Sequence, residues 1–418
     1  MQRIDGRACF EGEFALPGDK SITHRAVMLN ASAEGEAVIT NALMGEDCLS
    51  TLACMRLLGA DIQTDGTTLR VKGAPEFQNG KELNCGNSGT TLRLLTGLLA
   101  GKQIQAKLYG DCSLSSRPMK RVAEPLSLLG ADIKTTDGHA PVFLSPKKLH
   151  GARVDISVPS AQVKSAVLLA GISADGETTL TEPIKSRDHT ERMLAAMGAD
   201  IRVDGNAVAV KKSQLRAVDV SVPADISSAA YFMALGALKG KTLCKNVCIN
   251  PTRTGILTAF DRLGVRYSLQ SRRILGGEER ADILVEKSNM RAITLTAQDI
   301  PAMIDELPLV ALMCAFADGE THITGAKELR VKESDRIVAT AELINRLGGD
   351  CTPLSDGFII RGKRKLQGGD MDSHLDHRIA MTAAVGMLAS EKGGNLFRGE
   401  CCAISFPDFF EKIGVKVD

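Results

Sequence analysis

The chain repeats one pattern six times, and this repetition limits its possible folds more than any other feature of the sequence. Each copy has a helix-like stretch that ends in Leu-, Met- or Ile-Gly and then a strand-like stretch, as in RLLGADIQT, SLLGADIKT and NRLGGDCTP. The six glycines of this series are Gly59, Gly130, Gly198, Gly264, Gly348 and Gly414. Such a repeat is typical of supersecondary units that bury their faces against one another.

A second series of glycines begins a different strand in each copy, as in SAEGEAVIT, SADGETTLT and FADGETHIT. Four strands of the first series run into Asp-Gly pairs, which favour tight hairpin turns: Asp65-Gly66, Asp137-Gly138, Asp204-Gly205 and Asp356-Gly357. Each copy is therefore predicted to be a βαβαββ unit of an α/β protein. The sixth copy stops after the strand VKV, and we expect the N-terminal stretch GRACFEGEFAL to supply its hairpin partner and close the array.

Length and composition exclude several classes of protein. A chain of 418 residues is long enough for two or three domains, and 44% apolar residues suffice for buried cores. The 51 basic and 50 acidic residues nearly cancel, and the chain has no Trp and only three Tyr. Nucleic-acid binding over a broad surface is thus excluded, and any anion site must be local.

The cysteines and the apolar segments indicate a soluble protein of the cytoplasm. Eleven cysteines form no Cys-x-x-Cys pair, which favours reduced thiols over disulfides or a metal site. The opening MQRIDGRACFEGEF has no apolar signal core, and the longest apolar run, PLVALMCAFA, is too short to span a membrane. We therefore expect no metal and no membrane association.

Polar side chains stand at the starts of long apolar helices, as in PGDKSITHRAVML, CGNSGTTLRLL and HLDHRIAMTAAVGML. A helix N-terminus offers unpaired N–H groups and a positive dipole end, so several aimed at one point make a strong anion site. Capping is the better interpretation for Ser160 or Ser227 taken alone. Cations such as Lys20, Arg25 and Arg378 are unfavourable at a helix start unless an anion offsets them. Their presence predicts an anionic ligand.

The second helices of the repeats add further cations, in LSSRPMKRV, KSRDHTERML and ELRVKESDRI. Lys332 and Arg336 are spaced i, i+4 and share a helix face, with Glu333 beside them. Basic runs are often only solvated surface, and a repeat array can be a non-catalytic binding surface. Arginines and lysines from five separate segments instead favour a ligand with several negative charges.

Nine segments of the sequence together resemble one family, 5-enolpyruvylshikimate-3-phosphate synthase. They are PGDKSITHR, GNSGTTLR, RPMKRV, SAQVKSAVL, SRDHTERML, IDELP, LRVKESDRI, DHRIAM and SFPDFF, in the family's order along the whole chain. The resemblance implies two globular domains, each of three repeats arranged as an inside-out α/β barrel, with the active site in the cleft between them. Domain one would hold residues 1–17 and 227–418, and domain two residues 18–226.

The resemblance also implies a reaction. These enzymes transfer the enolpyruvyl group of phosphoenolpyruvate to the 5-hydroxyl of shikimate 3-phosphate and release phosphate, by addition–elimination through a tetrahedral intermediate. The reaction belongs to the shikimate pathway, which leads to chorismate and the aromatic amino acids. The family uses no cofactor and no metal, its members work as monomers, and glyphosate inhibits it by competing with phosphoenolpyruvate.

The family's functional residues carry over to matching positions. Shikimate 3-phosphate would be bound by Lys20, Ser21, Arg25, Ser160, Ala161, Gln162, Arg187, Asp305 and Lys332. Phosphoenolpyruvate would be bound by Lys20, Asn87, Gly89, Arg117, Gln162, Arg336 and Arg378. Asp305 and Glu333 would act as base and acid, with Lys20 assisting the departure of phosphate. For Glu333, a plain ion pair with Arg336 or Lys332 is the alternative.

Two positions depart from the family's pattern. Some members carry a lysine where this chain has Ile404, in AISFP. Cys112 stands where a sister enzyme, UDP-N-acetylglucosamine enolpyruvyl transferase, places its catalytic cysteine. The sister opens with Lys-Asn instead of Lys-Ser and lacks SAQVKSAVL and KESDR in this form. We therefore interpret Cys112 as a small loop residue and keep the sister reaction as the second hypothesis.

Overall fold

The computed structural model describes residues 1–74 and 76–416 and has an α/β fold with six small sheets. The chain divides into two compact units. Unit 1 holds Met1–Pro17, Pro223–Ile274 and Glu279–Asp418, and unit 2 holds Gly18–Val222 and Leu275–Glu278. The exact domain boundaries expected from the sequence stay a prediction.

Unit 2 contains three βαβαββ repeats. The first has β14 (Val220–Ser221), α1 (Lys20–Ala31), β3 (Glu36–Thr40), α2 (Glu46–Leu57), β4 (Asp61–Asp65) and β5 (Thr68–Lys72). The second has β6 (Lys81–Asn84), α3 (Gly89–Gly101), β7 (Ala106–Tyr109), α4 (Cys112–Ser115), α5 (Lys120–Leu128), β8 (Asp132–Thr136) and β9 (His139–Ser145). The third has β10 (Arg153–Asp155), α6 (Ala161–Gly171), β11 (Glu177–Thr181), α7 (His189–Ala196), β12 (Ile201–Asp204) and β13 (Ala207–Lys211).

Unit 1 contains the other three repeats. The fourth has β2 (Phe10–Ala15), α8 (Ile226–Lys239), β15 (Gly240–Cys248), α9 (Gly255–Leu263), β16 (Arg266–Leu275) and β17 (Glu278–Glu286). The fifth has β18 (Thr294–Leu295), the 3-10 helix η1 (Ile300–Ala302), α10 (Leu307–Ala315), β19 (Glu320–Ile323), η2 (Lys327–Val331), α11 (Arg336–Arg346), β20 (Cys351–Pro353) and β21 (Phe358–Arg361). The sixth has β22 (Met371–Asp372), α12 (His377–Ala389), β23 (Gly394–Phe397), η3 (Gly399–Ile404), α13 (Phe409–Lys412) and β1 (Gln2–Ile4).

The sheets confirm the predicted repeat. In the second repeat β6 pairs with β7 in parallel. Strand β9 pairs antiparallel with β7 on one side and with β8, its hairpin partner, on the other. The same order occurs in the third and fifth repeats. All six glycines of the first series have positive φ, between 69° and 106°. A residue with a side chain is strained in this region, which explains why glycine recurs where each helix ends.

The N-terminal segment corrects one expectation. The strand Gln2–Ile4, not the stretch from Gly6 to Leu16, joins the sheet of the sixth repeat, antiparallel to Gly394–Leu396. Phe10–Ala15 instead joins the sheet of the fourth repeat, parallel to β15. The expected strand VKV is absent at 415 and 416, and its last residue lies outside the described residues. The array therefore closes through the N-terminus, but by different strand pairings.

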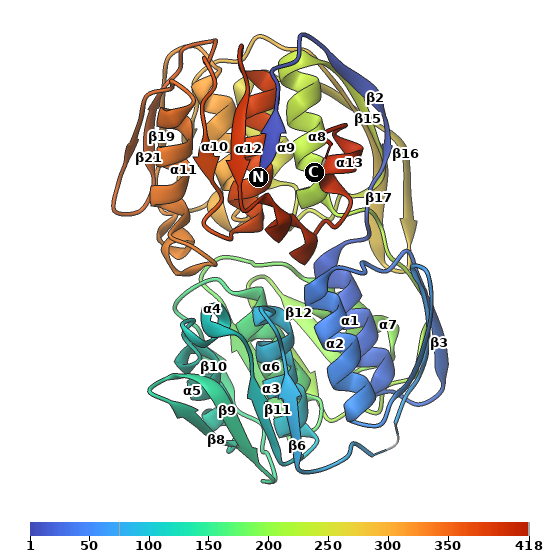
Figure 1. Cartoon of the computed structure of the whole chain (residues 1–418). Helices are drawn as coiled ribbons and strands as arrows, with labels where there is room; N and C mark the ends of the chain where they lie inside the picture. The colour runs from blue at the N-terminus through green and yellow to red at the C-terminus, as the bar shows by residue number, and fades with distance from the viewer. Residues whose placement is uncertain (75, 417–418) are drawn as a thin grey trace. The chain divides into compact units, whose positions relative to one another are not determined.

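The long helices form the interior of each unit. Helices α1, α3 and α6 are buried along most of their length, and Figure 1 shows the strands of unit 2 outside them. Helices α8, α10 and α12 are buried in the same way in unit 1. A Cβ on Gly97 would lie only 2.1 Å from the carbonyl oxygen of Ala166, so glycine is what lets α3 and α6 approach this closely.

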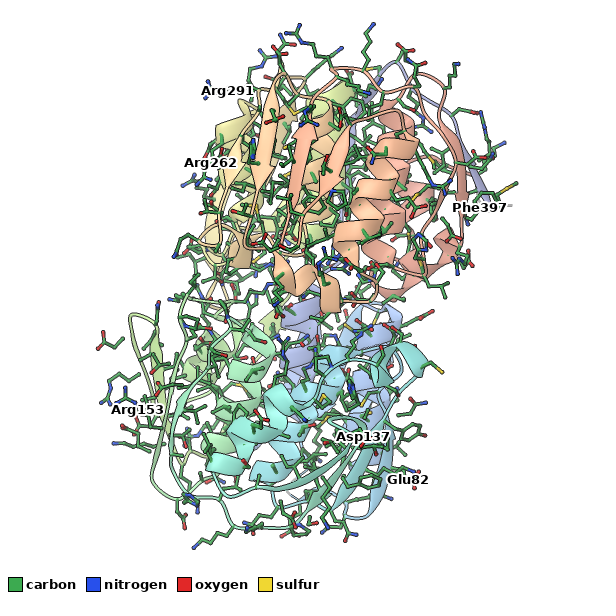
Figure 2. The ribbon with its side chains drawn as sticks, turned by 90° about the vertical axis from the view of Figure 1, so that its left-hand side faces the viewer. Glu82, Asp137, Arg153, Arg262, Arg291 and Phe397 are labelled. Atoms are coloured by element: carbon green, nitrogen blue, oxygen red, sulfur yellow. The ribbon has the colours of Figure 1, made fainter. Side chains whose placement is uncertain are left out.

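Charged residues of the outer strands and helices form the surface. Glu82, Asp137 and Arg153 of unit 2 point outward, as do Arg262 and Arg291 of unit 1 (Figure 2). Because these side chains are solvated, their charge needs no ligand. Several buried charged side chains lie instead at or near helix starts, among them Arg25, Arg336 and Arg378, and these carry the candidate site. Within the described residues, no helix has the length and apolar character needed to span a membrane.

Candidate active site

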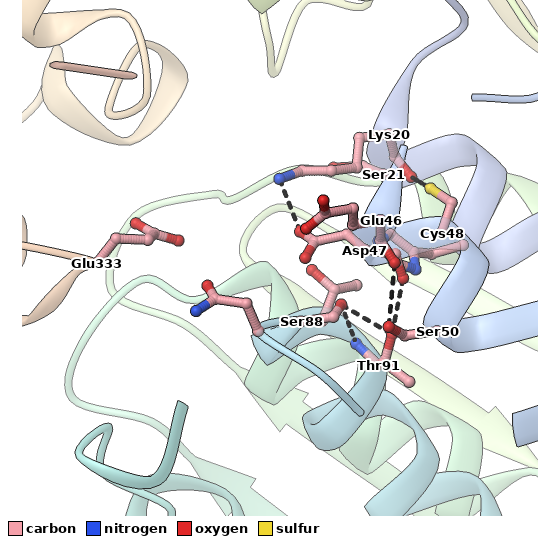
Figure 3. Close-up of polar contacts among 12 residues, drawn as sticks. Lys20, Ser21, Glu46, Asp47, Cys48, Ser50, Ser88, Thr91 and Glu333 are labelled. Atoms are coloured by element: carbon pink, nitrogen blue, oxygen red, sulfur yellow. Dashed lines mark hydrogen bonds and ion pairs between the residues drawn. The ribbon is translucent and has the colours of Figure 1, made fainter. Parts of the chain in front are cut away.

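Lys20 is the first residue of α1, where Asp19 caps the helix by accepting a hydrogen bond from the N–H of Ile22 at 2.9 Å. The Lys20 Nζ atom lies 3.0 Å from Oδ2 of Asp47, and both side chains are mostly buried (Figure 3). From the sequence we expected only a ligand anion to offset this cation. Asp47, near the start of α2, supplies part of that compensation from within the protein.

Arg25 lies one turn further along α1 and is buried. Its guanidinium donates to the carbonyl oxygen of Ser21 at 2.9 Å, to Oγ1 of Thr190 at 2.7 Å and to Oγ of Ser165 at 2.8 Å. Arg187 donates to the Ser21 hydroxyl at 3.5 Å. The structure thus brings Ser21, Arg25 and Arg187 together from segments more than 160 residues apart in sequence.

The start of α6 lies beside this group. Ser160 caps the helix and accepts from the N–H of Val163 at 3.4 Å. The carbonyl oxygen of Ala161 accepts from the hydroxyl of Ser165, the same side chain that accepts from Arg25. Ala161 is therefore connected to Arg25 through the Ser165 hydroxyl, and Ser160 is its neighbour in the chain.

The start of α3 collects the remaining candidates of unit 2. Arg117 donates to Oδ1 of Asn87 at 2.7 Å, and Arg93 donates to Oε1 of Gln162. A Cβ on Gly89 would lie 3.0 Å from Nη1 of Arg93 and 3.4 Å from Nη1 of Arg117. Glycine therefore leaves the backbone at this helix start open between two guanidinium groups.

Arg93 and Asp47 were not among the residues predicted from the sequence. Arg93 ends the motif GNSGTTLR and lies four positions after Gly89, so helix periodicity places both on one face. The four-residue spacing from Gly89 could therefore have identified Arg93 from the sequence. Asp47 lies 27 residues from Lys20, and no local pattern connects them.

In unit 1, Arg336 is the centre of an ionic cluster. Its guanidinium donates to Glu333 at 2.6 Å and to both carboxylate oxygens of Asp376 at 2.8 and 3.1 Å. Oδ1 of Asp305 lies 3.5 Å from Arg336 Nη1 and 4.0 Å from Lys332 Nζ. Four predicted residues therefore meet here, and Asp376 joins them.

Burial by itself lowers the pKa of the Arg336 guanidinium, but the charges of Asp376, Glu333 and Asp305 outweigh it, and the net shift is upward. Arg336 is only 1% exposed, so its charge is compensated by carboxylates and not by water. The arginine is therefore permanently charged, and it orders three acidic side chains around itself.

Arg378 lies at the start of α12, where Asp376 caps the helix and accepts from the N–H of Arg378 at 2.9 Å. Burial lowers the pKa of Arg378, while its interactions with Tyr231, Asp305 and Asp225 raise it, and the net direction is upward. Burial also raises the pKa of Tyr231 to about 12. Arg378 thus remains a cation in the same electrostatic environment as Asp305.

The two clusters differ in character. The cluster of unit 2 combines Lys and Arg side chains with hydroxyl and amide groups, which suits phosphate and carboxylate ligands. The cluster of unit 1 combines cations with two carboxylates that are candidates for proton transfer, Asp305 and Glu333. Within residues 1–74 and 76–416, no group of His, Cys, Asp and Glu is arranged to hold a metal ion.

The structure corrects the interpretation of one of the two positions that depart from the family's pattern. Cys112 is not a loop residue but the exposed first residue of the short helix α4, which Asp111 caps by accepting from the N–H of Leu114 at 2.7 Å. Ile404 ends η3 and packs partly buried against the core of unit 1.

Comparison with known proteins identifies the family. The family model for EPSP synthase (3-phosphoshikimate 1-carboxyvinyltransferase) matches residues 4–413. The 3-phosphoshikimate 1-carboxyvinyltransferase of Desulforudis audaxviator is 47% identical over 407 residues, covering 95% of each chain. That of Limosilactobacillus fermentum is 46% identical over 410 residues, covering 96% of this chain and 95% of that protein.

Comparison with solved structures leads to the same family. EPSP synthase from Acinetobacter baumannii superposes with a TM-score of 0.87 at 41% identity, covering 98% of this chain and 96% of that one. The enolpyruvyl transferase NikO from Streptomyces tendae, at 21% identity, has a TM-score of 0.81 over 100% of this chain and 98% of its own, which shows a shared fold. The chain therefore belongs to the EPSP synthase family, the 3-phosphoshikimate 1-carboxyvinyltransferases that catalyse enolpyruvyl transfer in the shikimate pathway.

Proposed function

We propose that the clusters of unit 1 and unit 2 serve this single reaction, with the residue roles carried over from the family. The observation that carries the proposal is the position of Asp305, a carboxylate within 4.0 Å of Lys332 and 3.5 Å of Arg336. An anion-binding scaffold would need the cations but no carboxylate among them. A proton-transferring enzyme needs both.

Asp305 is the proposed general base. Its two cationic neighbours favour the ionised carboxylate. Only the ionised form can accept the proton that the shikimate 5-hydroxyl loses as its oxygen bonds to C2 of the enolpyruvyl group. The side chain is 18% exposed, which leaves it accessible to substrate. In the balanced reaction this proton ends on the released phosphate.

Glu333 is the proposed partner that gives a proton to C3 during addition and takes one back during elimination. Its Oε2 atom accepts from Arg336 at 2.6 Å, so the ion pair considered from the sequence exists in the structure. The role in proton transfer is therefore proposed for Glu333 together with its arginine partner.

Lys20, Arg25, Arg117 and Arg187 are proposed to hold the phosphate and carboxylate groups of the two substrates, and Lys20 to stabilise the departing phosphate. Hydrogen bonds to other side chains of the protein hold Arg25 and Arg117 in position. Positioned cations of this kind stabilise developing charge without reorganising. We also propose that the enzyme works as a monomer in the cytoplasm.

The proposed function is tested by measuring phosphate release from phosphoenolpyruvate. We expect release with shikimate 3-phosphate, without added metal, and none with UDP-N-acetylglucosamine. Cys112→Ala should retain the activity, because this side chain is exposed and the reaction needs no thiol. Release with the nucleotide sugar, or loss of activity in Cys112→Ala, would favour the sister reaction.

Glyphosate sensitivity tests the phosphoenolpyruvate pocket proposed around Gly89. A methyl group there would lie 3.0 Å from Arg93 and would force its guanidinium to shift. We expect inhibition of the wild type at roughly micromolar concentration and a marked rise in the inhibition constant for Gly89→Ala, measured against varied phosphoenolpyruvate. Equal inhibition constants for the two proteins would show that Gly89 does not line the pocket.

A further inference from the structure

A chain of buried hydrogen bonds joins three helices of unit 2 beneath the proposed substrate contacts. Nδ1 of His24 on α1 lies 2.7 Å from Oγ1 of Thr51 on α2, and Thr51 Oγ1 lies 2.7 Å from Oγ1 of Thr91 on α3. Thr91 then contacts Ser88, whose side chain caps α3. All four side chains are fully buried, and Figure 3 shows the last link, between Ser88 and Thr91.

The contacts favour one direction for the hydrogen bonds in this chain. The hydroxyl of Thr91 donates to Oγ of Ser88 at 2.8 Å. Thr51 must therefore donate to Thr91, because Thr91 has no second proton to give. It follows that His24 donates to Thr51 from Nδ1–H, and that the Nε2 atom is an acceptor.

The surroundings of His24 agree with this neutral tautomer. Burial lowers the pKa of His24 well below its usual value, and the charges of Lys20 and Arg25 lower it further. Among the described residues, Nε2 has no hydrogen-bond partner. A buried acceptor without a partner is better tolerated than a buried N–H donor without one.

The hydrogen-bonded chain ends at two parts of the candidate site. Ser88 lies between Asn87 and Gly89, and its hydroxyl accepts from the N–H of Thr91 at 3.1 Å. The Thr91 hydroxyl also lies 3.3 Å from the carbonyl oxygen of Asp47, whose carboxylate pairs with Lys20. The Thr91 hydroxyl thus contacts both Asp47, the partner of Lys20, and Ser88, the residue before Gly89.

We infer that His24, Thr51 and Thr91 are positioning residues that set the start of α3, and with it Asn87 and Gly89, relative to Lys20. The inference rests on the proposed role of Asn87 and Gly89 in binding phosphoenolpyruvate. None of the three positioning residues touches substrate. They act by ordering the helix start that does.

Thr51→Val removes the central hydroxyl while keeping the shape of the side chain. His24 then loses its acceptor and Thr91 its donor, so the helix start is less well ordered. We expect the KM for phosphoenolpyruvate to rise about tenfold, the effect of one lost buried hydrogen bond, while the KM for shikimate 3-phosphate and kcat change less than about twofold.

Thr96→Val is the matched control, because Thr96 is a fully buried threonine of α3, the helix that carries Thr91. Its hydroxyl donates only within α3, to the carbonyl oxygen of Leu92 at 2.7 Å. We expect its KM for phosphoenolpyruvate to match that of the wild type. If both valine variants give the same KM, or if Thr51→Val raises both KM values equally, the inference is wrong.

Two His24 variants give an independent test should Thr51→Val fail to fold. The Asn side chain places an N–H donor the same number of bonds from Cα as Nδ1, so His24→Asn should keep KM within about threefold of the wild type. His24→Leu should raise the KM for phosphoenolpyruvate about tenfold, as expected for Thr51→Val. If Thr51→Val does fold, the double variant should raise this KM little further, because both substitutions break the same hydrogen-bonded chain. Equal KM values for phosphoenolpyruvate in His24→Asn and His24→Leu would overturn the inference. An inactive wild type would instead overturn the proposed function.

Discussion

Asp305→Asn is expected to lower kcat by about 100-fold or more, because general-base catalysis contributes a factor of that order. The substitution keeps the size of the side chain and removes its ability to take a proton. The KM for shikimate 3-phosphate should change only a few fold, since Lys332 and the cations of unit 2 remain. Steady-state kinetics of phosphate release measure both quantities.

Asp299→Asn is a suitable control for this variant. Asp299 is also paired with an arginine, with Oδ1 2.6 Å from Nη2 of Arg262, but it lies in the turn before η1 and has no proposed chemical role. Its kcat should equal that of the wild type. A kcat near the wild-type value in Asp305→Asn would rule out Asp305 as the base and leave it as an ion-pair partner of Arg336.

Arg336→Met is expected to abolish measurable activity and to destabilise unit 1 by about 3–5 kcal/mol, the usual result of removing one partner from a buried ionic cluster. The remaining carboxylates, Asp376 and Glu333 above all, would lose their principal hydrogen-bond donor. Asp376 would still cap α12. Denaturant unfolding followed by circular dichroism measures the loss of stability. The loss is taken from the shift of the unfolding midpoint, because the two units need not unfold in one step.

Arg346→Met provides the matched comparison on the same helix. Arg346 pairs with Glu342 one turn earlier at 2.8 Å, and its side chain is 55% exposed. Exposed pairs of this kind contribute about 1 kcal/mol or less, so the midpoint and the activity should hardly change. Similar losses in the two variants would mean that the Arg336 cluster adds nothing beyond an ordinary surface pair.

The repeat and much of the site could be predicted from the sequence because both depend on local patterns. Glycine at the end of each helix reflects a positive φ that other residues avoid, and this preference is visible without a structure. The spacing of Lys332 and Arg336 predicted that they share a helix face with Glu333 beside them, and this was wrong. Lys332 and Glu333 lie in the bend between η2 and α11, and only Arg336 belongs to the helix, so the three groups meet at a helix start. The nine family motifs then indicated which charged residues to propose for the candidate site, including Asp305.

Which distant segments meet was decided only by the tertiary structure. The three-residue strand Gln2–Ile4 is too short to be recognised, and its pairing with Gly394–Leu396 depends on how the whole of unit 1 closes. The pairing of Lys20 with Asp47, and the contact of Arg93 with Gln162, likewise join separate helices. Sequence periodicity describes one helix or strand at a time. A buried charge without a partner is energetically costly, so charged side chains from different helices pair with one another when the helices pack. The sequence by itself therefore determined the repeated unit and the identity of the charged residues, while the packing of the helices decided how those charges are compensated.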